Sequence, residues 1–236
     1  GNTVDLCPVG ALTSVDFRHR ARVWDLVPRP GVCPHCAVGC NLMWEPWLGR
    51  IQRVMPRRND DVNELWLCDK GRFGHHFASA AERLAAPLVR RGGELVEATW
   101  DEALTYVALR LVELRATLGA AAVGGIAGDG LPNEDLYLFG RFLRSIVGCN
   151  NVDHLPGIVR DDVLIRAGVP MGTTWADVGA RWAVLVVGLD TENEAPLLDV
   201  HLRRALQRGA AIVNVSGRPS QLERLADVNL RYRHGS

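Results

Sequence analysis

The chain of 236 residues has almost no lysine. Lys70 is its single lysine, although lysine and arginine together number 27. Aspartate and glutamate also number 27, so the formal net charge is zero. Proteins that bind nucleic acids normally carry a basic excess, so the balanced charge argues against a nucleic-acid partner. A general compositional bias accounts for the arginines but not for the position of the one lysine.

Long apolar runs and a signal peptide are absent as well. No run approaches the roughly 18–20 apolar residues that a membrane span requires, so we expect no direct membrane insertion. The phrase G-x-G-x-x-G is also missing, and no dinucleotide site of that kind is predicted. The chain begins at Gly1 without a methionine and stops at Ser236. We expect it to be a fragment of a longer polypeptide.

Cysteine is scarce, but four of the six cysteines follow a metal-type pattern. Cys33, Cys36, Cys40 and Cys68 have the spacing C-x2-C-x3-C-x27-C. Four thiolates around one centre are typical of tetrahedral zinc or of a [4Fe–4S] cluster. Zinc sites usually repeat C-x2-C on both sides, so the three-plus-one arrangement favours the [4Fe–4S] cluster. A zinc-dependent interaction module, and reduced core cysteines or a disulfide pair, are the alternatives.

Two further residues are candidates for this chemistry. Cys7 is followed by Pro8, which is how the last ligand of a ferredoxin-type cluster often appears. Cys7 is therefore predicted to be the final ligand of a second [4Fe–4S] cluster whose other ligands lie upstream. Lys70 lies two residues after Cys68, where its ammonium group would donate hydrogen bonds to sulfur and raise the cluster potential. The neighbouring histidines, His75 and His76, are expected on the solvated surface.

The remaining sequence predicts alternating strands and helices. A hairpin is expected over residues 41–56 and a turn-containing link over 88–96. Thr99 and Glu102 form a capping box for a helix that ends at Gly119. A strand is then expected over 121–126, a helix over 133–147 and a short strand around Val152. A strand over 183–187, buried on both faces, is expected next, followed by a helix over 196–208 and a strand over 211–215. The predicted fold class is α/β, with a small cysteine-rich [4Fe–4S] module of short β-strands followed by a doubly wound parallel sheet.

Several phrases resemble one protein family. Residues 1–13, the four-cysteine pattern and the run Cys68-x-Lys70-Gly71-Arg72 are similar to the large iron–sulfur subunit (the G subunit) of bacterial NADH:quinone oxidoreductase, or respiratory complex I. The rest resembles the start of the molybdopterin-oxidoreductase fold that this subunit shares with formate dehydrogenases and periplasmic nitrate reductases. The resemblance implies three parts: the end of a ferredoxin-like domain (1–30), a [4Fe–4S] module (31–86) and the start of a truncated α/β domain (87–236).

The resemblance also implies a function. Electrons would pass from NADH through a flavin partner and several clusters to quinone, without a catalytic site in this chain. The expected partners are the flavin- and NADH-binding subunit and the quinone-side iron–sulfur subunits of the peripheral arm. The expected location is the cytoplasmic face of the bacterial inner membrane. The cluster of Cys33 to Cys68 would lie off the main electron path, and that of Cys7 on it.

The molybdenum relatives supply an alternative function. In them, a phrase like Asn151–Val152–Asp153 leads six residues on to a metal-ligating cysteine or selenocysteine followed by histidine. Here those positions hold Val159 and Arg160. Valine cannot ligate molybdenum, and Cys149 is expected to be a small buried residue. No molybdenum is therefore expected, and a molybdopterin formate dehydrogenase or nitrate reductase is the runner-up.

Overall fold

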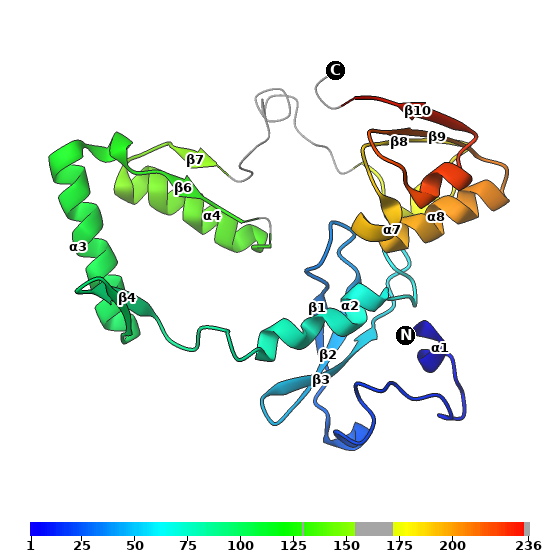
Figure 1. Cartoon of the computed structure of the whole chain (residues 1–236), viewed down its shortest axis with the longest axis horizontal. Coiled ribbons are helices and arrows are strands. Elements are labelled where there is room, and N and C mark those ends of the chain that lie inside the picture. The colour runs from blue at the N-terminus through cyan, green and yellow to red at the C-terminus, as the bar shows by residue number, and fades with distance from the viewer. Residues whose placement is uncertain (129, 154–171, 234–236) are drawn as a thin grey trace. The chain divides into compact units, whose positions relative to one another are not determined.

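A computed structural model describes residues 1–128, 130–153 and 172–233, and the chain divides into two compact units (Figure 1). The first unit combines Gly1–Arg83 with Pro170–Ser236, and the second comprises Leu84–Val169. Each unit contains a sheet of parallel strands. This confirms the α/β class expected from the sequence.

The cysteine-rich half of the first unit is built on an antiparallel sheet with the strand order β1-β2-β3. Its strands are β1 (Arg29–Val32), β2 (Asn41–Trp47) and β3 (Arg50–Pro56). The predicted hairpin over 41–56 is confirmed. Its turn residues Leu48 and Gly49 both have positive φ, 48° and 72°, as a two-residue type I′ turn requires. The register of β2 against β3 shifts between Glu45 and Pro46, where proline offers no amide to the ladder.

The other half of the first unit is a parallel sheet with the order β10-β9-β8. Its elements are β8 (Ala183–Val187), α8 (Pro196–Gln207), β9 (Ala211–Ser216) and β10 (Val228–Arg231). The predicted helix and both predicted strands are confirmed. The expectation that β8 is buried on both faces is wrong among the described residues. Val186 is buried, whereas Leu185 on the opposite face is 64% exposed.

One apolar core joins the two halves of the first unit. Short helical segments complete the unit: α1 (Asn2–Asp5), η1 (Val23–Asp25), α2 (Asp69–Phe73), η2 (Gly74–Ser79), α6 (Trp175–Val178), α7 (Thr191–Glu194) and η5 (Gln221–Arg224). Described residues from 172 to 233 pack with the cysteine segment in this core, although about a hundred residues separate the two segments in sequence. The core side chains are Cys33, Val38, Cys40, Leu42, Val54, Leu67, Val186, Ala195, Leu197, Leu198, Leu202, Ile212 and Leu222.

The second unit begins with a hairpin where the sequence predicts a link. Strands β4 (Leu88–Arg91) and β5 (Glu94–Glu97) pair through a turn at Gly92 and Gly93, both of which have positive φ. The capping box of α3 (Trp100–Leu118) is confirmed: Thr99 accepts from the Glu102 amide, and the Glu102 carboxylate accepts from the Thr99 amide.

The remaining elements of the second unit surround a small parallel pair of strands. They are η3 (Ala120–Ala122), β6 (Gly125–Ile126), α4 (Asn133–Arg141), the π-helical η4 (Phe142–Val147) and β7 (Val152–Asp153). The strand predicted over 121–126 is shorter than expected, since its first residues form η3. A Cβ on Gly125 would lie 2.2 Å from Leu143 Cδ1, so the helix packs directly on the strand backbone.

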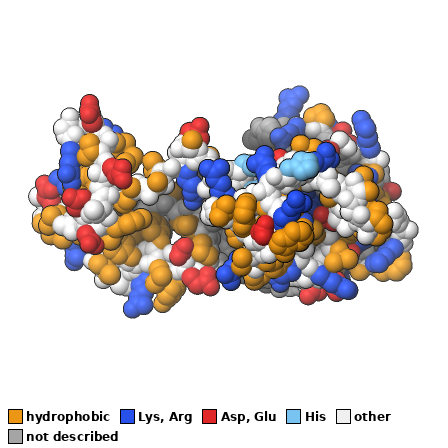
Figure 2. Space-filling model, turned by 90° about the horizontal axis from the view of Figure 1, so that it is seen from below, with side chains coloured by type: hydrophobic (Ala, Val, Ile, Leu, Met, Phe, Trp, Pro, Cys, Tyr) orange, Lys and Arg blue, Asp and Glu red, His pale blue; other side chains and the backbone are white. Residues whose placement is uncertain are grey.

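The surface mixes apolar side chains with charges of both signs, as the face in Figure 2 shows. No residue of α3 is buried by the described residues. Among the helices in the described ranges, none is both long and apolar enough to cross a membrane.

Candidate metal centre

Cys33, Cys36 and Cys40 lie in the loop that joins β1 to β2. The strands pair up to Val32 and Asn41, and the Cys33 amide then donates to the Cys40 carbonyl at 2.8 Å. Gly39 has a φ of 64°, and its amide donates to the Cys36 carbonyl at 3.3 Å. The β-ladder therefore fixes both ends of an eight-residue loop that carries three thiols.

Cys68 reaches the same place from the start of α2. It is the N-cap of this helix, and its Sγ accepts a hydrogen bond from the Gly71 amide at 3.4 Å. A Cβ added to Gly71 would lie 3.2 Å from Cys33 Sγ and 2.8 Å from Leu67 Cδ1. The first turn of α2 therefore contacts the cysteine loop, and the four predicted ligands come from two adjacent structural elements.

The four sulfur atoms lie within electrostatic range of one another. The pKa of Cys40 is raised to about 12, first by burial and then by negative charge on Cys33, Cys68 and Cys36. Burial likewise raises the pKa of Cys33, to which Cys68 and Cys36 add. Several thiolates in such a place need a compensating cation, which a metal centre provides.

The donor set fits an iron–sulfur cluster. All six cysteines are free thiols, and Cys33 and Cys40 are buried beside the apolar side chains of Val38, Leu42 and Leu67. Soft sulfur donors in a water-poor setting are the usual ligands of such clusters. Within the described residues, no group of three or more His, Cys, Asp or Glu side chains forms a site for a metal ion. The fit therefore rests on the chemistry and burial of the thiols.

The side chain of Lys70 has a partner outside the cysteine loop. Its Nζ donates to the carbonyl oxygen of Asn193, in α7, at 2.6 Å. The hydrogen bond to Cys68 sulfur comes from the Gly71 backbone, one residue further along the helix. Lys70 thus ties α2, whose N-cap is Cys68, to the parallel-sheet half of the first unit.

Cys7 lies after α1, outside the four-cysteine loop. Backbone amides of the following turn lower the pKa of its thiol, with Leu12 contributing most, then Val9, and Ala11 and Gly10 adding less; slight burial acts in the opposite direction. An array of N–H groups directed at a sulfur favours the thiolate, which is the form that binds metal. The surroundings of Cys7 therefore suit a cluster ligand.

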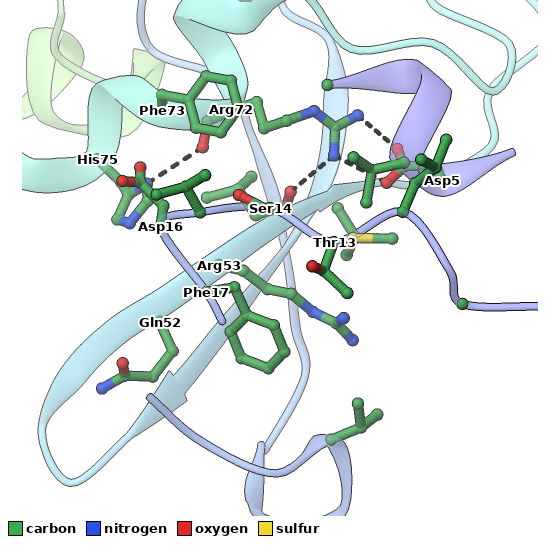
Figure 3. Close-up of a pocket in the computed structure, with 18 residues that line it drawn as sticks. Asp5, Thr13, Ser14, Asp16, Phe17, Gln52, Arg53, Arg72, Phe73 and His75 are labelled. Atoms are coloured by element: carbon green, nitrogen blue, oxygen red, sulfur yellow. Dashed lines mark hydrogen bonds and ion pairs between the residues drawn. The ribbon is translucent and has the colours of Figure 1, made fainter. Parts of the chain in front are cut away.

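Arg72 links the segment of Cys7 to the helix of Cys68. Its buried guanidinium forms an ion pair with Asp5 (Figure 3). It also donates to Asn2 Oδ1 at 3.1 Å and to the Val54 carbonyl at 3.4 Å. The pair borders a cavity of about 660 Å³ between residues 1–23, β3 and the α2–η2 segment. No cysteine lines this cavity. Sequence reasoning missed this link, because Asp5 and Arg72 are 67 residues apart.

The two neighbouring histidines differ in their surroundings. His75 is buried, with Nδ1 3.2 Å from the Arg72 carbonyl, and burial lowers its pKa. His76 is exposed and has Nε2 2.9 Å from Asp16 Oδ2. The expectation of a solvated pair is therefore wrong for His75 and confirmed for His76. The two rings contact each other, with centroids 4.4 Å apart.

The positions that bear on molybdenum are described only in part. Val159 and Arg160 lie outside the described residues. Cys149 is buried with Leu143 and Val147 in the core of the second unit, which confirms that it is a small buried residue.

Comparison with known proteins assigns both parts of the chain to one superfamily. The model of the molybdopterin oxidoreductase Fe4S4 domain matches residues 29–80, and that of molybdopterin oxidoreductase matches residues 83–234. The acetylene hydratase from Pelobacter acetylenicus superimposes with a TM-score of 0.64 at 16% identity, over 85% of this chain and 29% of that one. At this identity the likeness concerns the fold alone.

Curated relatives are much longer than this chain. The G subunit of NADH-quinone oxidoreductase from Streptomyces coelicolor is 36% identical over 88% of this chain, and the alignment covers 26% of the relative. NADPH-Fe(3+) oxidoreductase subunit alpha of Geobacter sulfurreducens is 35% identical over 100% of this chain and 28% of the relative. The chain therefore spans about a quarter of the length of these relatives.

Proposed function

Because the chain belongs to the molybdopterin oxidoreductase family, we propose that it is an electron-transfer part of the large iron–sulfur subunit of a bacterial NADH:quinone oxidoreductase. The observation that carries this proposal is the position of the cysteines. All four candidate ligands fall inside the matched Fe4S4 domain, in a chain 36% identical to the large iron–sulfur subunit from Streptomyces coelicolor. The subunit would carry electrons from NADH and flavin toward quinone, with no catalytic site in this chain.

Cys33, Cys36, Cys40 and Cys68 would hold one [4Fe–4S] cluster. Such a cluster, when bound, supplies reversible one-electron transfer. The apolar side chains of the shared core keep water from the thiols, and the Gly71 amide donates to Cys68 Sγ. Exclusion of water and N–H groups at sulfur are the means by which a protein sets a cluster potential. Lys70 is proposed to add a positive charge close to this cluster.

Cys7 is proposed as the last ligand of a second [4Fe–4S] cluster, with the other ligands outside this sequence. Its amide-lined surroundings support this role.

We propose that the chain binds no molybdenum, and that residues 1–30, 31–86 and 87–236 are separate sequence modules. The matched ranges 29–80 and 83–234 support the latter two. The cluster of Cys7 is proposed to lie on the main electron path, and the four-cysteine cluster off it.

The proposed partners are the flavin- and NADH-binding subunit and the quinone-side iron–sulfur subunits of the peripheral arm. The proposed location is the cytoplasmic face of the inner membrane, as part of a membrane-bound complex. The name of the Streptomyces relative supports an assembly of this kind.

A second candidate function is favoured by the Geobacter relative. Its identity of 35% extends over the whole chain and is nearly equal to that of the Streptomyces relative. A chain in that assembly would serve a reaction in which NADPH reduces Fe(III). The two candidates share the cluster site and differ in the nucleotide and the final electron acceptor.

The test is metal analysis with low-temperature EPR on the anaerobically purified full-length protein in its complex. The proposal predicts iron and sulfide without molybdenum, cluster signals that develop with NADH, and reoxidation by quinone. Reduction by NADPH alone, with Fe(III) as the acceptor, would favour the second candidate. Stoichiometric molybdenum with formate or nitrate turnover would contradict both.

A further inference from the structure

The side chain of Asn63 is buried in the excursion between β3 and Cys68. It is 1% exposed, and its amide group makes four hydrogen bonds. The Asn63 Oδ1 accepts from the Asn41 amide at 2.8 Å. The Asn63 Nδ2 donates to the carbonyl oxygens of Asn41 at 3.2 Å, Trp66 at 3.0 Å and Arg57 at 3.4 Å.

These partners connect the two arms of the cysteine site. Asn41 directly follows Cys40, and Trp66 lies two residues before Cys68. The Asn63 backbone also takes part, because its carbonyl accepts from the Trp66 amide at 2.8 Å. One residue therefore bonds to both ends of the 27-residue stretch that separates the third cysteine from the fourth.

We infer that Asn63 is a positioning residue for the four-cysteine centre, which fixes the place of Cys68 relative to Cys40. The inference rests on the proposed cluster. A carboxamide suits the position because it offers one acceptor to the Asn41 amide and two N–H donors to carbonyl oxygens. An aspartate of the same shape would direct an oxygen at those carbonyls and leave them without a donor.

Asn63→Asp in the full-length protein tests this role, with Asn214→Asp as the matched control. Asn214 is also 1% exposed and lies in the same unit, in β9, where its Nδ2 donates to Asn229 Oδ1 at 3.0 Å. The four-cysteine centre is identified by the iron and the EPR signal that are lost in the Cys33→Ala variant. The measurement is the rate at which this iron passes to a chelator without oxygen, with the urea midpoint measured in parallel.

Asn63→Asp is expected to release this iron to the chelator about 10- to 100-fold faster than wild type, in line with the usual loss of metal affinity when a residue that supports metal ligands is replaced. Asn214→Asp is expected to lower the urea midpoint and to keep the wild-type iron release. Wild-type release from Asn63→Asp would overturn the inference. Should that variant fail to fold, Asn63→Ser is compared in the same way. A wild-type protein without Cys33-dependent iron would overturn the proposed function itself.

Discussion

At the scale of single residues, Gly71 shows how closely α2 approaches the cysteine loop. A Cβ at this position would meet Cys33 Sγ at 3.2 Å and Leu67 Cδ1 at 2.8 Å. The same residue donates its amide to Cys68 Sγ. A methyl group here would therefore require Leu67 or Cys33 to move.

Gly71→Ala is expected to push α2 away from the cysteine loop and to lower the free energy of unfolding by about 1–3 kcal/mol. It is also expected to speed the release of iron from the four-cysteine centre. Gly172→Ala is the control, since no described residue lies within 4 Å of a Cβ added to Gly172, which has an ordinary φ. Urea unfolding and anaerobic iron release measure the two effects. Equal behaviour of the two variants would show that the site tolerates a methyl group at Gly71.

Residue identity and spacing alone lead to the prediction of four ligands, because ligand chemistry is carried by the cysteines themselves. The supporting residues were not predictable in this way. Asn63 bonds to Asn41 across 22 positions, and Arg72 bonds to Asp5 across 67. Nothing in the local sequence of Asn63 or Arg72 indicates these partners. The burial of His75 likewise depends on neighbours that only the fold brings together.

At the scale of elements, the link between α1 and α2 carries a testable consequence. Arg72 and Asp5 are paired with side chains that are only 7% and 16% exposed. A charge left alone in such a place is costly, because neither water nor a counter-ion compensates it.

Asp5→Asn is therefore expected to destabilise the protein by about 3 kcal/mol, since it leaves the Arg72 guanidinium without its counter-ion. It should also disturb the EPR signal of the cluster to which Cys7 is proposed to belong. The control is Asp60→Asn, which breaks a solvent-exposed pair with Arg58 and should have little effect. Similar unfolding curves for the two variants would contradict a structural role for the Arg72–Asp5 pair.

Most helices and strands can be predicted from local sequence patterns, whereas the burial of their faces by neighbouring elements cannot. The turn at Leu48–Gly49, the capping box at Thr99 and the proline that starts α8 all act within a few residues, so these elements were predictable. The apolar run 183–187 predicts a strand but not how many of its faces are covered. That depends on which strands and helices lie beside it. The strand predicted over 121–126 is confined to Gly125–Ile126, because the small residues before it form a 3₁₀ turn.

At the scale of the whole first unit, the cysteine segment and the parallel sheet share one core and several polar contacts. Glu64, four residues before Cys68, forms an ion pair with Arg204 on α8. Trp175 Nε1 donates to the carbonyl of Val38, inside the cysteine loop, at 3.1 Å. These contacts hold the cysteine segment against the parallel-sheet half of the unit.

The Glu64–Arg204 pair predicts a pH dependence. A hydrogen bond from Arg204 lowers the pKa of Glu64 below its ordinary value of 4.5, with the Arg204 charge adding to this and burial opposing it. A lowered pKa in the folded state means that the stabilisation is fully present above about pH 4.5 and is lost as the pH falls through the folded-state pKa. Glu64→Gln should unfold at lower urea than wild type at pH 7, and the gap should close in acid. A gap that is constant with pH would contradict this.

The iron content of two matched cysteine variants of the full-length protein tests the proposed cluster site most directly. Cys33 and Cys149 are similarly buried, at 5% and 4% exposure, but only Cys33 belongs to the four-cysteine centre. Cys33→Ala is expected to lose the one cluster, about four iron atoms per chain, with its EPR signal. Cys149→Ala is expected to keep both. Wild-type iron in Cys33→Ala would show that these four cysteines do not hold a [4Fe–4S] cluster.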